Sequence, residues 1–115
     1  MTDDLIFRLA DPAALGAAAL SGVYEGTAHD QTDGFIHCSA RHQIEGTLAA
    51  HFSDVDRIAL AVIDARKLGA SLKWEKSRGG EDFPHIYGPL PFAAILRVHL
   101  LRRDESGGWR LPEEL

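Results

Sequence analysis

The stretch Ile58-Ala59-Leu60-Ala61-Val62-Ile63 is an uninterrupted apolar run. A run of this length and composition predicts a strand that is buried on both faces at the centre of a sheet. Shorter runs rich in β-branched, aliphatic and aromatic residues, bounded by turn residues, predict the other strands. These strands are expected at residues 5–9, 35–38, 72–75, 84–88, 95–101 and 109–111.

Two main helices are predicted in the first half of the chain. Asp11-Pro12 opens the first helix, since an aspartate side chain can cap free amides and proline is tolerated in the first turn. Gly22 is suited to end that helix. Ser39 is expected to cap the second helix, which runs to about Phe52. Residues 23–33 show no apolar period and are expected to be irregular.

These elements favour an α+β fold over a doubly wound α/β fold, because the strands outnumber the helices and do not alternate with them. Residues 1–115 have room for one domain. We expect a single compact domain with mixed or antiparallel sheets of short strands. Side chains alternate along a strand, so Trp74 is expected in the core while Glu75 faces the other way.

The composition indicates which kinds of binding partner and which cellular compartment to expect. A formal net charge of −5 argues against a general nucleic-acid binder, which is normally basic. No apolar run is long enough to span a bilayer. Cys38 is the only cysteine, so an intramolecular disulfide is excluded and a reducing compartment is favoured. We therefore expect a cytoplasmic protein with a small-molecule ligand; the composition does not indicate an oligomeric state.

The strongest candidate site residues follow from alternation around His37. In a strand, His37 and Ser39 share one face, while Ile36 and Cys38 share the other. If Ile36 and Cys38 pack into the core, His37 and Ser39 face a cleft. Two other interpretations stay open: Ser39 as a helix cap only, and His37 as a buried histidine bonded to the backbone.

A second candidate group lies in the later strands. His85 and Tyr87 share a face if residues 84–88 are extended, and two polar aromatic groups there suit a planar ligand. Glu75 is a candidate base or ribose ligand, and Arg78, in a flexible polar loop, can reach a phosphate. The alternatives are a structural tyrosine and a surface ion pair of Glu75 with Lys73 or Arg78, which would stabilise little.

Metal and thiol chemistry are weaker interpretations of the same residues. The chain has six histidines, but their spacings match no standard ligand set, so no metal site is predicted from sequence. Convergence of His29, His37 and His85 in space remains an alternative. A thiol nucleophile at Cys38 is disfavoured, because alternation places Cys38 on the opposite face from His37.

Three motifs resemble the domain-of-unknown-function 952 family over residues 6–101. They are Asp33-Gly34-Phe35-Ile36-His37-Cys38-Ser39, Leu72-Lys73-Trp74-Glu75 and Phe83-Pro84-His85-Ile86-Tyr87-Gly88-Pro89-Leu90. That family is distantly similar to the ADP-ribosyltransferase superfamily, whose members bind NAD in a cleft between two small sheets. The resemblance implies such a fold and a nucleotide-like ligand.

Residue by residue, the resemblance implies that His37 and Ser39 hold a ribose and that Tyr87 stacks on the nicotinamide. Cys38 stands where the superfamily motif has glycine. Glu75 is the best available acid, but it precedes Tyr87, whereas the superfamily acid follows the tyrosine.

The leading hypothesis is therefore an ADP-ribosyltransferase-like enzyme or a binder of NAD or an ADP-ribose derivative. In it, Glu75 and His85 are catalytic, and His37, Ser39, Arg78 and Tyr87 bind the ligand. Two alternatives are a non-catalytic small-molecule binding module and a metal-dependent hydrolase that uses His37, His85 and Glu75.

Overall fold

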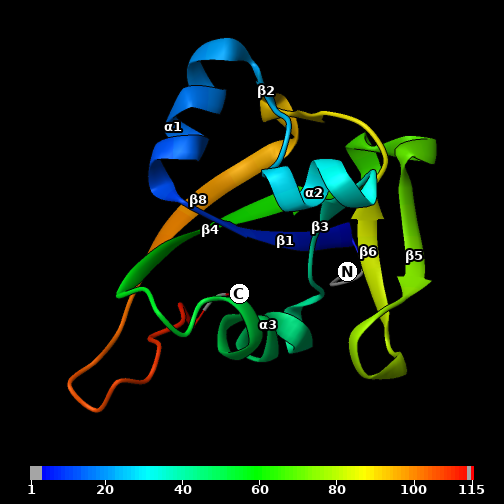
Figure 1. The fold of residues 1–115 in the computed structure, drawn as a ribbon. Coiled ribbons are helices and arrows are strands. Elements are labelled where there is room, and N and C mark those ends of the chain that lie inside the picture. The colour runs from blue at the N-terminus through cyan, green and yellow to red at the C-terminus, as the bar shows by residue number, and fades with distance from the viewer. Residues whose placement is uncertain (1–3, 114) are drawn as a thin grey trace.

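A three-stranded antiparallel sheet crosses the middle of the molecule in the computed structural model, which describes residues 4–113 and 115 (Figure 1). Its strands, in the order β1-β4-β8, are β1 (Leu5–Ala10), β4 (Arg57–Asp64) and β8 (Ile95–Arg102). Every residue from Ile58 to Ile63 is at most 4% exposed. The apolar run is thus the central strand, as its composition predicts.

A second sheet lies beside the first and carries half of the candidate site residues. It pairs β3 (Ile36–His37), β6 (Asp82–Ile86) and β5 (Leu72–Lys76) in the order β3-β6-β5. A small third sheet pairs β2 (Val23–Tyr24) with β7 (Leu90–Pro91). All of these strand pairs are antiparallel. An isolated bridge between Phe7 and Ser39 ties β1 to the chain that leaves β3.

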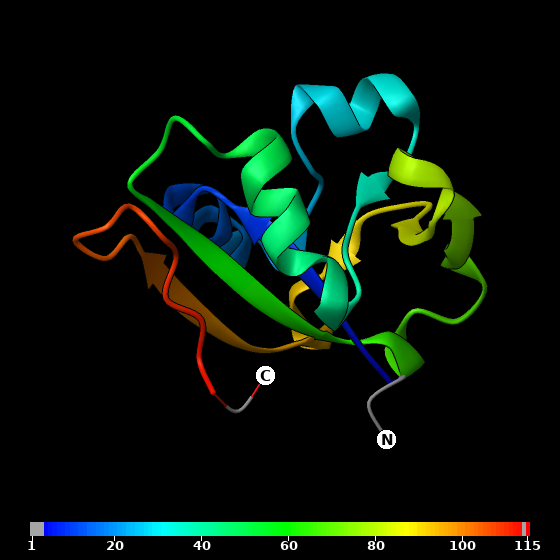
Figure 2. The same cartoon turned by 90° about the horizontal axis from the view of Figure 1, so that it is seen from below.

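Helices cover both faces of the central sheet, as the two views at right angles show (Figures 1 and 2). On one face, Leu15 and Ala18 of α1 (Pro12–Ser21) belong to a core cluster with Ile6 of β1. On the other face, Ile44 and Leu48 of α3 (Ile44–His51) pack in a cluster with Phe7 of β1. The alternation of β1 therefore divides the core into two layers.

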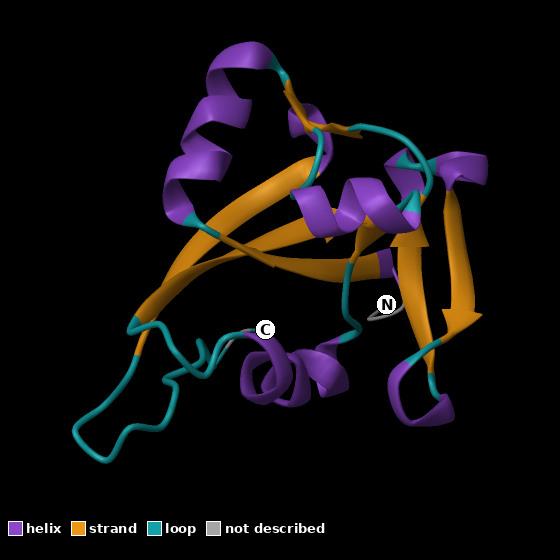
Figure 3. Cartoon of the chain, viewed as in Figure 1, coloured by secondary structure: helices purple, strands orange, loops and turns teal. Residues whose placement is uncertain are grey.

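The remaining elements are short. Among the described residues, the 3₁₀ turns are η2 (Arg41–Gln43), η3 (Ala65–Lys67), η4 (Gly69–Ser71), η5 (Arg78–Gly80) and η6 (Phe92–Ala94). Figure 3 shows how strands dominate the middle of the molecule while helices lie around them. The α+β class with antiparallel sheets is confirmed. No helix in the described part of the chain is long and apolar enough to cross a membrane.

The prediction of two helices with an irregular segment between them is wrong in one respect. Residues 23–33 contain β2 and a third α-helix, α2 (Ala28–Asp33). Thr27 and Asp30 form a reciprocal capping box at its start, and Gly34 ends it with a left-handed φ of 87°. α2 was missed because its stability comes from these caps and not from an apolar stripe.

Three further expectations need correction. Ser39 does not cap α3, which begins at Ile44; instead, Ser39 forms the bridge with Phe7. Trp74 is not in the core, since 46% of its surface is exposed. No terminal strand forms at residues 109–111, where Trp109 makes one isolated bridge to Arg103.

Candidate ligand-binding site

The two histidines of the predicted site lie opposite each other on neighbouring strands. His37 of β3 pairs with His85 of β6, and the ring centroids are 5.8 Å apart. The next pair along, Ile36 and Ile86, is buried on the other side, and Cys38 is only 5% exposed. The alternation predicted around His37 is therefore confirmed, because the aliphatic residues fix the orientation of the strands.

A cavity of about 340 Å³ opens between the central sheet, the second sheet and α3. Four of the six predicted site residues line it: His37, Ser39, Arg78 and His85. Glu75 and Tyr87 do not line it; Glu75 hydrogen-bonds to His85, and Tyr87 donates to Glu75. Aromatic and aliphatic side chains supply much of the remaining wall, including Phe7, Leu9, Phe52 and Phe83.

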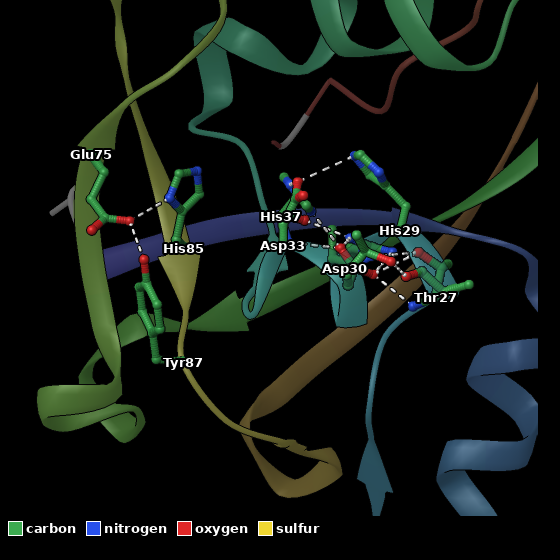
Figure 4. Close-up of polar contacts among 11 residues, drawn as sticks. Thr27, His29, Asp30, Asp33, His37, Glu75, His85 and Tyr87 are labelled. Atoms are coloured by element: carbon green, nitrogen blue, oxygen red, sulfur yellow. Dashed lines mark hydrogen bonds and ion pairs between the residues drawn. The ribbon is translucent and has the colours of Figure 1, made fainter.

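Glu75, His85 and Tyr87 form one hydrogen-bonded group (Figure 4). Oε1 of Glu75 lies 2.7 Å from Nδ1 of His85 and accepts from the Tyr87 hydroxyl at 2.8 Å. These hydrogen bonds, first from His85 and then from Tyr87, lower the pKa of Glu75, while the bond to Glu75 raises the pKa of Tyr87.

This geometry leaves one nitrogen of His85 free. An ionised carboxylate only accepts hydrogen bonds, so Nδ1 of His85 carries the proton that it donates to Glu75. Nε2 is the other ring nitrogen, and no described residue bonds to it. His85 is 3% exposed and lines the cavity, so its free nitrogen can reach a ligand only there. A carboxylate that orients a histidine in this way is the arrangement of an activated base.

Phe35 fixes the position of these rings. It stacks on His85 with a centroid distance of 3.9 Å and also contacts His37 at 4.6 Å and Tyr87 at 5.2 Å. The side of the second sheet that carries the histidines is therefore a continuous aromatic layer, in which His85 has little freedom to rotate.

Behind His37 lies a buried ionic network that sequence reasoning missed. Asp30 is 2% exposed, and its carboxylate accepts two hydrogen bonds from Arg8, at 3.0 and 2.7 Å. Arg8 also donates to the Tyr24 hydroxyl and to the carbonyl of His37. Burial alone would raise the pKa of Asp30, but the charge and hydrogen bonds of Arg8, with those of His37 and Thr27, hold it well below its usual range.

The ring of His37 contacts a carboxylate on each side. Nδ1 lies 2.6 Å from Asp30, and Nε2 lies 2.8 Å from Asp33. His29 stacks on the same ring with a centroid distance of 4.6 Å, and its Nε2 lies 3.6 Å from Asp33. His37 is thus not bonded to the backbone through its side chain, but it can meet a ribose hydroxyl through Nε2 only if Asp33 moves away.

A third polar group lies at the end of the cavity near α3. The hydroxyls of Ser39 and Thr47 are 2.9 Å apart, and Arg78 donates to Thr47 at 3.2 Å. The guanidinium of Arg78 also lies over Phe83, 4.8 Å from the ring centroid. No ion pair among the described residues involves Arg78, so its charge is available to an anion at the cavity mouth.

His51 completes this end of the cavity. Burial lowers the pKa of His51, and the neighbouring Arg78, His29 and His37 lower it further. Sequence reasoning did not assign His51 to the site. It faces the cavity together with Thr47 because the two are four residues apart on α3 and so share one helix face.

The structure does not gather the metal ligands expected for a hydrolase. Glu75 and His85 bind each other, and Nε2 of His37 faces Asp33. A thiol nucleophile is also disfavoured, since Cys38 is buried and burial raises its pKa to about 12. A thiol that stays protonated is a poor nucleophile.

Solved structures of another protein are similar to this chain in sequence and in fold. A crystal structure of protein CC0527 from Caulobacter crescentus is 41% identical in sequence, with a TM-score of 0.86 over 93% of this chain and 94% of that chain. A solution NMR structure of CC0527 is also 41% identical and has a TM-score of 0.84, covering 100% of this chain and 97% of that chain. A search of the curated proteins finds no match.

A family model described as "Protein of unknown function (DUF952)" matches residues 9–98. The match includes the candidate residues on β3, β5 and β6, and it covers the whole second sheet together with β4 of the central sheet. With most of the sequence inside the model, the chain belongs to the DUF952 family.

Proposed function

We propose that this chain binds a nucleotide-like small molecule of the NAD or ADP-ribose type in the cavity between its two sheets. The observation that carries the proposal is the convergence of Ser39, Arg78 and the free nitrogen of His85 on one largely apolar cavity. Binding sites for small molecules are usually apolar clefts with a few well-placed polar groups. The resemblance to the ADP-ribosyltransferase superfamily supports the same class of ligand.

Arg78 supplies the preference for a phosphate. A guanidinium binds phosphate oxygens with two parallel hydrogen bonds. Among the described residues, the side chain of Arg78 hydrogen-bonds only to the neutral hydroxyl of Thr47. The Arg78 side chain can therefore turn to an anion without leaving a carboxylate unpaired. Ser39 and Thr47 add hydroxyl groups within reach of the same ligand.

The size of the cavity limits what it can enclose. Its volume of about 340 Å³ is near the lower end of the roughly 300–1,000 Å³ that is typical of ligand pockets. One half of a dinucleotide fits such a space, and the other half would lie over the mouth beside Arg78. Tyr87 is 38% exposed and does not line the cavity, so the stacking on nicotinamide that the resemblance implies is not part of this proposal.

His85 and Glu75 extend the proposal to catalysis. In an ADP-ribosyl transfer, the bond from the ribose to nicotinamide breaks while the oxygen of an acceptor bonds to the same carbon. Nε2 of His85 can take the acceptor's proton, and Glu75 holds the ring in the required tautomer. Glu75 is then a positioning residue, because it does not line the cavity.

Ligand binding is tested by thermal unfolding and calorimetry with NAD, ADP-ribose and AMP. A ligand at 100 times its dissociation constant adds about 2.7 kcal/mol, which raises the Tm of a domain this size by roughly 10 °C. Arg78→Gln is expected to weaken binding of all three, while Arg57→Gln, a control on an exposed arginine of β4, leaves it unchanged. The proposal fails if none of these compounds shifts the Tm at millimolar concentration.

Catalysis is tested separately by release of nicotinamide from NAD. His85→Gln is expected to abolish release while NAD still binds, and His42→Gln, a control on an exposed histidine, is expected to behave as the wild type. If the wild type binds NAD but never releases nicotinamide, the chain is a non-catalytic binding module.

A further inference from the structure

His29, Asp33 and His37 bring three metal-binding side chains to the rim of the cavity (Figure 4). His29 and Asp33 are four residues apart, one turn of α2, and His37 follows on β3. One ligand atom from each residue lies within 4.8 Å of the other two. We propose that these three side chains bind one divalent transition-metal ion of the zinc class.

The distances fit the coordination sphere of such an ion. Zinc binds imidazole nitrogen and carboxylate oxygen at roughly 2.0–2.2 Å in a tetrahedron, so neighbouring ligand atoms lie roughly 3.3 Å apart. Oδ2 of Asp33 is 2.8 Å from Nε2 of His37 and 3.6 Å from Nε2 of His29. These two distances lie on either side of the ideal value. Small side-chain rotations of His29 and Asp33, which are both exposed, would complete the geometry.

The second observation is the contact behind His37. A histidine that binds a metal through one nitrogen usually donates its other N–H to a carboxylate, which fixes the tautomer and the ring. Nδ1 of His37 lies 2.6 Å from Asp30, and Asp30 is itself buried and held by Arg8. Nε2 is thereby directed to Asp33 and His29. An exposed cluster of charges would lack this rigid support.

The donor set indicates the class of metal and its coordination. Two imidazoles and one carboxylate favour zinc-like ions over magnesium or calcium, which prefer oxygen ligands. Three protein ligands leave a fourth position open in a tetrahedral site. Because His29 and His37 also line the cavity, an ion held there would present that position at the cavity rim. The proposal does not depend on the nucleotide ligand.

Metal binding is measured on the chelator-treated full chain with Zn²⁺ or Co²⁺ alone. Calorimetry is expected to show one ion per chain, and bound Co²⁺ is expected to give the visible absorption of a tetrahedral nitrogen and oxygen site. His29→Gln removes a ligand from the surface of α2. Mutating a residue that only hydrogen-bonds to a metal ligand typically weakens metal binding roughly 10–100-fold. His29→Gln removes a ligand itself, so we expect it to weaken Zn²⁺ binding by more than that. His42→Gln, equally exposed but outside the cluster, should bind as the wild type.

The NMR signals of the histidine rings test the same site in the wild-type protein, without any substitution. On addition of Zn²⁺, the signals of His29 and His37 are expected to move, while those of His42 and His99 stay in place. Absence of stoichiometric Zn²⁺ or Co²⁺ binding overturns the proposal. The proposal is also overturned if His29→Gln binds Zn²⁺ as tightly as the wild type. The same holds if Zn²⁺ moves the NMR signal of His42 and leaves that of His29 in place. None of these results bears on whether NAD binds, which is measured without metal.

Discussion

Asp30→Asn is the substitution that tests the buried network most directly. Each carboxylate oxygen of Asp30 accepts three hydrogen bonds. Oδ1 accepts from Arg8 and twice from His37, and Oδ2 accepts from Arg8 and twice from Thr27. Asparagine keeps the shape but replaces one oxygen with an NH₂ group, which then faces donors. The substitution also leaves the charge of Arg8 buried without a counter-ion.

The expected loss of unfolding free energy in Asp30→Asn follows from the burial of both Arg8 and Asp30. The side chains of Arg8 and Asp30 are 8% and 2% exposed. Removing one partner of a buried ion pair typically destabilises a protein by about 3–5 kcal/mol. With an m value of about 2 kcal/mol/M in urea, a loss of about 4 kcal/mol lowers the unfolding midpoint by about 2 M. That is a large fraction of the roughly 5–15 kcal/mol that stabilises a typical domain.

The assay is equilibrium unfolding in urea, followed by tryptophan fluorescence and circular dichroism. Asp64→Asn is the matched control, because Asp64 is also little exposed but its partner Arg66 has a side chain that is 70% exposed. Its midpoint should change much less, since Arg66 stays solvated after the substitution. Equal midpoint shifts for Asp30→Asn and Asp64→Asn would refute the claim that burial of Arg8 sets the cost.

Three further predictions concern other parts of the site. Cys38 in the folded protein should react with a thiol reagent only after unfolding, because it is buried and its pKa is raised to about 12. Tyr87→Phe should raise the carboxyl titration midpoint of Glu75 measured by ¹³C NMR, because it removes one of the hydrogen bonds that lower this pKa. Gly46→Ala in α3 should stabilise the fold by about 0.5–1 kcal/mol in urea, since the new methyl would meet only the flexible end of Arg78 at 3.4 Å.

Each of these predictions has an opposing result. Modification of native Cys38 at the rate of a free thiol would show that the core opens there. The lowered pKa of Glu75 means that its hydrogen bonds stabilise the fold above the ordinary glutamate range and are lost as the pH falls through the lowered value. An unchanged midpoint in Tyr87→Phe would contradict the hydrogen bond. Destabilisation by Gly46→Ala would show that Arg78 cannot move.

The sequence predicts the strands well because their signals are local. The apolar run at residues 58–63 predicts a doubly covered strand, and the alternation at Ile36, His37 and Cys38 correctly assigns the buried side. α2 was missed for the opposite reason, since Thr27 and Asp30 stabilise it as caps and it has no apolar stripe. A threonine followed three residues later by an acid, with a glycine after the segment, was the available signal.

Arg8 is the other signal that the sequence offered. A charge inside the apolar stretch Leu5-Ile6-Phe7-Arg8-Leu9 must be paired if that strand is buried, because an unpaired buried charge is costly. The partner cannot be identified from the pattern, since Asp30 is 22 residues away and several acids are available. The same limit applies to Arg78 and Thr47, which are 31 residues apart and meet only through the packing of α3.

His37 and His85 show how contacts between residues far apart in the sequence determine the surroundings of a side chain. His37 and His85 have the same alternating, aromatic surroundings in the sequence, and they lie opposite each other in one sheet. His37 is held on both nitrogens by carboxylates, one buried and one exposed, which suits it to hold a cation in place of a proton. Among the described residues, only Glu75 bonds to the ring of His85, through Nδ1, and His85 lines the cavity.

The geometry therefore suits His85 better than His37 to proton transfer, and the sequence hypothesis makes the same assignment. Moving a proton requires a nitrogen that can gain and lose it while the ring stays in place, and only His85 combines a fixed ring with a free nitrogen at the cavity. The difference comes from which helix or strand lies behind each ring. α2 supplies Asp30 and Asp33 to His37, and β5 supplies Glu75 to His85. The pairing of the second sheet with α2 thus gives two identical side chains different hydrogen-bond partners, and this difference is the basis of the different roles that we propose for them.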